Sequence, residues 1–208
     1  LDRLIRKVTK QISGKRTYYI IECGGNGDCL YAAIAAGRKW QKVQITGDYE
    51  ASYNSQENDD IYQYRQIAVN EMQSSPEQYG LSAKTVDLIN QHRQNGLPAN
   101  GIAICALVKA LELDLRIYKK ETGNNKILCY KFAPIRQAGT ECQTRKPRIR
   151  LLLQNQHYQL LIPEENYQKY SHCEACCYIK EDGDQQGKKV TIQEGKYITI
   201  TNFNTEEE

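Results

Sequence analysis

One short stretch combines the residue types that nucleophilic catalysis needs. The segment GGNGDCLYAAIAAG, residues 24–37, opens with glycines, continues with a lone cysteine at position 29 and ends in an apolar run. Asp28 suits a helix N-cap, so Cys29 would begin a helix, where orphan backbone N–H groups and the helix dipole favour a thiolate. The glycines let backbone N–H groups converge, as an oxyanion hole requires. The pattern indicates a nucleophile; a small buried thiol after a glycine turn is the alternative interpretation.

A nucleophilic cysteine needs a base, and the chain has only 3 histidines. His92 lies in the polar stretch NQHRQNG, and His172 lies among the late cysteines. His157 begins HYQLLI, directly after the strand-like RIRLLL and the short QNQ. A histidine at the start of a buried strand is held rigidly, as a base must be, so His157 is the predicted base. A histidine that only closes a hairpin is the alternative.

A third group should orient the imidazole ring of that base. Side chains at positions i and i+2 of a strand share a face, so the amide oxygen of Gln159 could accept a hydrogen bond from Nδ1–H of His157. Asn155 is the other near candidate. Both side chains are neutral, so either would stabilise an imidazolium less than a carboxylate does.

Hydrophobic patterning predicts helices first and strands later. Apolar spacing and capping residues predict helices over residues 1–11, 29–40, 61–73, 82–93 and 100–113. Runs rich in β-branched and aromatic residues predict strands over residues 16–23, 113–120, 126–132, 148–153 and 157–162. The polar segment 44–60 is expected to be an exposed loop. The pattern predicts an α+β fold with a central, mostly antiparallel sheet flanked by helices.

Two regions are expected along the chain. Residues 1–166 form one domain, for which the length of 208 residues allows a sizeable core. From residue 167 the chain turns polar, and we expect 167–208 to be an extension of that domain. Within the extension, KVTIQEGKYITITNF (residues 189–203) predicts a β-hairpin.

Composition and charge exclude several classes of function. A hydrophobic content of 40% with 25% charged residues is ordinary for a soluble globular protein. No apolar run has the length of about 20 residues that a membrane helix needs, and no signal-peptide pattern opens the chain. The net charge of +3 is too small to indicate nucleic-acid binding, and the basic cluster TRKPRIR lacks interleaved aromatic residues. We expect neither a membrane segment nor a nucleic-acid partner.

The 8 cysteines do not form a disulfide pattern. Cys23, Cys105 and Cys129 lie in apolar segments at irregular spacing, which is typical of free thiols in a reducing compartment. The late segment HCEACC, from His172 to Cys177, could contribute zinc ligands, but the chain has no second Cys-x-x-Cys pair to complete four. We therefore expect no metal and no cofactor.

Three segments, in order, resemble the ovarian tumour (OTU) family of papain-like cysteine proteases, most of which are deubiquitinases. NGDCLY is similar to the family's Asp-Gly-Asn-Cys-Leu-Phe/Tyr signature, and HYQLL is similar to its His-Tyr segment near the end of the domain. Between them, NGIAICALVKALELDLRIY resembles the family's helix-then-strand stretch. The resemblance spans residues 16–163 and implies a papain-like OTU fold.

The resemblance also implies roles for individual residues. Cys29 would be the nucleophile, His157 the general base, and the backbone amides of Asn26 and Cys29 the oxyanion hole. Two departures from the family pattern matter: Asn26 and Asp28 exchange the family's usual Asp and Asn, and Gln159 stands where the family commonly has Asp or Asn. The third member of the site could therefore come from elsewhere in the chain.

The implied function is a thiol-dependent isopeptidase that removes ubiquitin, or a ubiquitin-like modifier, from conjugates. Because the tail of ubiquitin is basic, Glu57, Asp59 and Asp60 are candidate docking residues. Two alternatives remain open from sequence: a catalytically weak ubiquitin-binding module, and a viral-type protease that processes its own polyprotein. The expected location is the cytoplasm, or the host cytosol for a pathogen effector or viral protein. The oligomeric state is not indicated.

Overall fold

The computed structural model describes residues 9–25, 27–46, 57–82, 86–94, 96–120, 127–132, 148–166 and 189–200. In chain order the described elements are β1 (Thr9–Ile21), α1 (Cys29–Thr46), α2 (Glu57–Ser74), the 3-10 helix η2 (Pro76–Tyr79), α3 (Val86–Gln91), α4 (Gly101–Ala110), β2 (Leu115–Lys120), β3 (Ile127–Phe132), β4 (Ile149–Gln154), β5 (His157–Pro163) and β6 (Lys189–Ile200). Helices come before most of the strands, as the sequence predicts.

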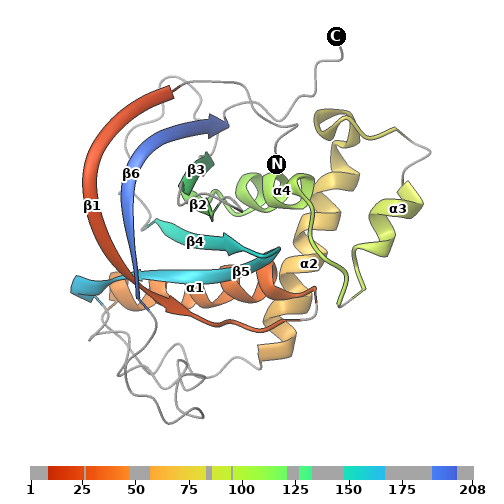
Figure 1. Ribbon diagram of the computed structural model, residues 1–208. Coiled ribbons are helices and arrows are strands. Elements are labelled where there is room, and N and C mark those ends of the chain that lie inside the picture. The colour runs from red at the N-terminus through yellow and green to blue at the C-terminus, as the bar shows by residue number, and fades with distance from the viewer. Residues whose placement is uncertain are drawn as a thin grey trace.

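The described strands form one curled sheet in the order β1-β5-β4-β2-β3-β6, closed by the pairing of β6 with β1. Only the pairs β2/β4 and β3/β6 are parallel, and the other described pairs are antiparallel. Figure 1 shows β1 and β6 as long curved strands on the side of the sheet away from α2 and α4. The predicted α+β fold with a mostly antiparallel sheet is confirmed.

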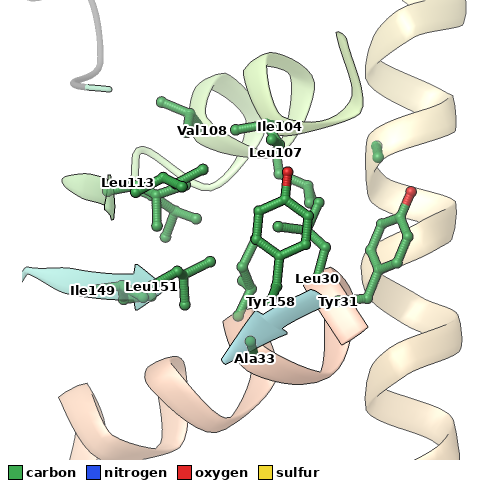
Figure 2. Packing of buried hydrophobic residues seen from close by; sticks show 14 of the residues in the cluster. Leu30, Tyr31, Ala33, Ile104, Leu107, Val108, Leu113, Ile149, Leu151 and Tyr158 are labelled. Carbon is green, nitrogen blue, oxygen red and sulfur yellow. The ribbon is translucent and has the colours of Figure 1, made fainter. Parts of the chain in front are cut away.

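The main core lies between the sheet and the helices. α1 packs against β4 and β5, and α2 packs against both α1 and α4. In Figure 2 the side chain of Tyr158, from β5, lies between α1 and the buried face of α4, where Ile104 and Leu107 contribute. α4 begins with a side-chain cap, because Asn100 Oδ1 accepts from the backbone N–H of Ala103 at 2.9 Å. These contacts fix the ends of α1 and β5 relative to each other.

Several predicted boundaries are wrong. Residues 9–11, predicted as the end of a helix, belong to β1, because the sheet extends this strand beyond its aromatic run to pair with β6. The helix α2 begins at Glu57, inside the predicted loop, since acidic residues are favourable in the first turn of a helix. The helix predicted over 82–93 corresponds to α3 (Val86–Gln91), which ends two residues earlier than predicted.

The segment predicted as a hairpin forms a single strand. β6 runs from Lys189 to Ile200 without a reversal and pairs with β1 on one side and β3 on the other. A second, smaller cluster of buried residues joins it to the sheet; this outer cluster consists of Tyr18, Tyr118, Cys129, Leu152, Leu161 and Ile192. β6 therefore closes the same sheet that carries β5.

We predict that Ile192→Ala lowers the free energy of unfolding by about 2–5 kcal/mol, because it leaves a cavity in the outer cluster. Thr191→Ala is the matched control: Thr191 is exposed and shares a hydroxyl hydrogen bond of 3.1 Å with Thr17, so it should cost about 1 kcal/mol or less. Urea unfolding followed by circular dichroism measures both. Equal, small effects at the two positions would mean that β6 does not close the sheet.

Candidate active site

The glycine loop, defined here as residues 24–28, delivers Cys29 to the first position of α1. The carbonyl of Asp28 accepts the first helical hydrogen bond, from the N–H of Ala32 at 3.0 Å, which confirms Asp28 at the N-cap position. Gly24 and Gly27 have positive φ angles of 114° and 86°. A Cβ on Gly27 would lie 2.0 Å from the carbonyl oxygen of Gly96, so only glycine fits there. Cys29 follows this loop and is 8% exposed.

A two-residue turn places His157 at the start of β5. β4 and β5 pair with Gln154 opposite His157, so Asn155 and Gln156 form the turn between them. Both turn residues have positive φ angles, 51° and 64°, which is the backbone of a tight hairpin and which asparagine tolerates well. The turn fixes the register of β5, and with it the position of His157. Asn155 is exposed in this turn, and it serves as a turn residue.

The neighbouring strand supplies a carboxylate to the histidine. β1 pairs with β5 in antiparallel register, with Ile21 opposite Leu160, so the next residue, Glu22, lies across from Gln159. Side chains opposite each other and on the adjacent diagonal of one sheet face are within contact distance. Glu22 therefore reaches both Gln159 and His157.

The contacts of Glu22 define the histidine's orientation. Oε2 of Glu22 lies 2.9 Å from Nε2 of His157, and Oε1 accepts from the side-chain amide of Gln159. An ionised carboxylate can only accept, so in neutral His157 the shared proton belongs to Nε2 and the lone pair belongs to Nδ1. The sequence-based expectation placed this contact at Nδ1 and on Gln159. The structure places it at Nε2 and on Glu22, because the register of β1 with β5 brings this charged acceptor to the imidazole ring.

The helix that Cys29 begins packs against β5, the strand that His157 begins. Tyr158, next to His157, is buried, and this burial raises the pKa of its hydroxyl; the charge of an ionised Cys29 raises that pKa further. The predicted nucleophile and the predicted base therefore belong to two elements that pack against each other.

Other thiols in the described part of the chain have a different environment. Cys23, Cys105 and Cys129 are buried, in keeping with the apolar segments that carry them. The Cys23 thiol donates to the carbonyl of Ile21 at 3.4 Å. Burial raises the pKa of Cys105 to about 12, so this thiol stays protonated at neutral pH and is a poor nucleophile.

The remaining predicted site residues have side chains outside the described part of the structure. Asn26 lies outside the described residues. Glu57, Asp59 and Asp60 lie at the start of α2, and their side chains are likewise outside the described part. Within the described ranges no group of His, Cys, Asp or Glu side chains could hold a metal ion, and the late Cys/His segment 172–177 falls outside those ranges.

Sequence reasoning missed Glu22, although a signal was present. Glu22 follows the apolar run YYII and immediately precedes Cys23 and the glycine loop. A lone carboxylate at the end of a strand is ordinary. Its importance depends on the pairing of β1 with β5. This pairing brings together Glu22 and His157, which are 135 residues apart in the chain.

No protein-family profile matches the sequence, and no curated protein matches it significantly. Solved structures do match. The viral OTU domain protease from Taggert virus has a TM-score of 0.51 at 10% identity, over 76% of this chain and 88% of that one. The OTU domain of OTUD1 has a TM-score of 0.49 at 15% identity, over 70% and 85%. An OTU deubiquitinase from Wolbachia pipientis wMel, bound to ubiquitin, has a TM-score of 0.49 at 12% identity, over 71% and 97%.

The chain therefore has the OTU fold, which is the fold that the three sequence segments imply. None of the helices in the described part of the chain combines the length and the apolar character that a membrane crossing requires.

We predict that ¹⁵N NMR of neutral His157 shows a protonated Nε2 and an unprotonated Nδ1. Glu22→Ala should remove this preference and give a mixture of the two tautomers, because the carboxylate that holds the Nε2 proton is gone. Glu165→Ala is a matched control: Glu165 is also 55% exposed and pairs with Arg16 at 3.8 Å. A tautomer that does not change in Glu22→Ala would contradict the assignment.

Proposed function

We propose that this protein is a cysteine isopeptidase that removes ubiquitin, or a ubiquitin-like modifier, from conjugates. The observation that carries the proposal is the contact of Glu22 with Nε2 of His157, on a strand packed against the helix that Cys29 begins. This contact leaves Nδ1 as a base. Within an OTU fold, a thiol, a base and a carboxylate that orients the base are the groups that acyl transfer through a thioester requires.

Each group has a defined task in the proposed reaction. Nδ1 of His157 takes the proton from the Cys29 thiol, and the thiolate attacks the carbonyl of the modifier's C-terminal glycine. Backbone N–H groups of the glycine loop and of Cys29 stabilise the oxyanion of the tetrahedral intermediate. The amine then leaves with the proton from His157, and water hydrolyses the thioester. Glu22 is a positioning residue that holds the ring and stabilises the imidazolium while it exists.

Ubiquitin is the proposed substrate because the fold is that of OTU domains, and the Wolbachia pipientis structure with this fold contains ubiquitin. The acidic residues at the start of α2, Glu57, Asp59 and Asp60, are the proposed contact for the basic tail of ubiquitin. Complementary charge of this kind mainly speeds encounter and sets the register. It would make association slower at high salt.

We place the activity in the cytoplasm, which for a pathogen effector or a viral protein means the host cytosol. A nucleophilic thiol requires a reducing environment to remain active, and this requirement supports the proposed location.

We predict that ubiquitin with a C-terminal propargylamide forms a covalent adduct with the parent protein and none with Cys29→Ala. His157→Ala should slow adduct formation and di-ubiquitin cleavage by about 10²–10⁴-fold, because the thiol then lacks its base. Intact mass and a panel of di-ubiquitins measure the two activities, and the panel also gives the linkage preference.

Two variants serve as controls for this experiment. Cys105→Ala removes a buried, protonated thiol and should still form the adduct. His172→Ala removes a histidine of the late Cys/His segment and should cleave di-ubiquitin at close to the parent rate. Equal losses at His172 and His157 would place the site in the late segment instead. A parent protein that binds ubiquitin but never forms the adduct would be a binding module, and this outcome would contradict the proposal.

A further inference from the structure

The helix α2 carries a charged side chain on its buried face. Ile61, Ala68, Val69 and Met72 mark the face that packs into the core, and Arg65 lies on that same face. Its side chain is 0% exposed. A guanidinium remains charged in proteins, so its burial is costly unless several acceptors surround it.

The acceptors come from the glycine loop and from the segment that follows α3. Nε of Arg65 donates to Oδ1 of Asp28 at 2.8 Å, and a terminal nitrogen donates to the same oxygen. Arg65 also donates to the backbone carbonyls of Gly27 at 3.1 Å, Leu97 at 2.7 Å and His92 at 3.2 Å. The guanidinium carbon lies 4.3 Å from the centre of the Tyr31 ring.

Asp28 also binds the segment that follows α3. The backbone N–H of Gly96 donates to both carboxylate oxygens of Asp28 at 3.0 Å. Gly27 packs directly against the Gly96 carbonyl, where a Cβ would not fit. The arginine and the aspartate thus tie three segments together: α2, the glycine loop and the segment after α3.

These bonds determine which way the peptide groups beside Cys29 point. The carbonyl of Gly27 is turned inward, toward the buried Arg65, and the N–H of Asp28 donates to the carbonyl of Gly25 at 3.2 Å. The carbonyl of Asp28 points along α1 to Ala32, so the N–H of Cys29 in the same trans peptide points the opposite way, out of the helix N-terminus. A carbonyl oxygen turned outward here would repel a developing oxyanion.

We infer that Arg65 and Asp28 are positioning residues that hold the backbone of residues 27–29 so that the amide of Cys29, and not the carbonyl of Gly27, faces the reacting carbonyl. This inference rests on the proposed function, because it assigns the pair a role in the same acyl transfer. Arg65 and Asp28 touch no reacting atom; they act through the backbone of residues 27–29. Loss of the pair should therefore slow reactions of Cys29 that form an oxyanion more than it slows other reactions of the same thiol.

The test compares two reactions of the same thiol. Cleavage of a ubiquitin C-terminal fluorogenic amide passes through an oxyanion, whereas alkylation of Cys29 by iodoacetamide is a displacement at carbon that builds none. Alkylation is followed by mass spectrometry of the peptide that contains Cys29. A residue that only stabilised the fold or the thiol would change both rates together.

Asp28→Ala removes the acceptor shared by Arg65 and Gly96. We expect kcat to fall by about 10²-fold, KM to stay within about threefold, and the alkylation rate to stay within about threefold of the parent. Asp28→Asn should recover kcat to within about tenfold, because an amide oxygen at the place of Oδ1 still accepts from Nε and the terminal nitrogen of Arg65 and from Gly96.

Arg93→Gln is the matched control. Arg93 also joins α2 to the segment after α3, because it donates to Asn70 and Gln73 of α2 at 2.8 Å each. It also donates to Asn90 of α3 at 3.3 Å, and none of these bonds involves the glycine loop. Its kcat should stay within about threefold of the parent. Should Asp28→Ala not fold, Arg65→Lys replaces it: a lysine keeps the charge but cannot reach all four acceptors, so kcat should fall about tenfold with alkylation unchanged.

Failure of this inference can be separated from failure of the proposed function. A parent protein that cleaves no ubiquitin substrate contradicts the proposed function. In that case acylation of Cys29 by p-nitrophenyl acetate, which also forms an oxyanion, replaces cleavage of the ubiquitin amide in the comparison. A drop in acylation without a drop in alkylation supports the positioning role. Equal drops in both reactions, or no drop in Asp28→Ala and Arg65→Lys, would overturn it.

Discussion

The antiparallel pairing of β1 with β5 is the contact on which the rest of the site depends. With Ile21 opposite Leu160, the end of β1 lies beside the start of β5, which places Glu22 against His157. The same register sets where the chain leaves the sheet to form the glycine loop, and therefore where α1 begins. A shift of one residue would turn Glu22 to the opposite face and remove the carboxylate from the histidine. One strand pair thus aligns the proposed base, the group that orients it and the loop that carries the nucleophile.

The other side of the site depends on a buried charge. Arg65 is fully buried, yet most of its donors have acceptors, and these acceptors are the glycine loop and its neighbours. Burying a pair of charges is a poor way to gain stability, since desolvation offsets much of the attraction. The advantage of the buried pair is geometric, because the N–H groups of a planar guanidinium form good hydrogen bonds only when the acceptors lie in a few fixed directions. The loop is thus held by directional bonds, whereas the strand that carries His157 is held by sheet pairing and by the core around Tyr158.

The sequence predicts the local features of this protein better than the distant ones. Cys29 at a loop–helix junction and His157 at the start of a strand follow from glycine, capping and strand patterns within a few residues. The roles of Glu22 and β6 could not be found this way, because they come from pairing between segments far apart in the chain. The alternation of apolar and polar residues in β6 fits a hairpin as well as a single strand. Arg65 was a missed signal: it is a charged residue at helical spacing from Ile61 and Met72, on a face that is otherwise apolar.

The central claim is that a carboxylate from β1 acts through the histidine of β5. A double-mutant cycle on kcat/KM for a ubiquitin amide tests it most directly, with Glu22→Ala, His157→Ala and the double variant, and with Glu165→Ala in place of Glu22→Ala as the control cycle. The account predicts that Glu22→Ala lowers kcat/KM in the parent but has almost no further effect once His157 is absent, while Glu165→Ala has little effect in either background. Additive losses from Glu22→Ala and His157→Ala would contradict it.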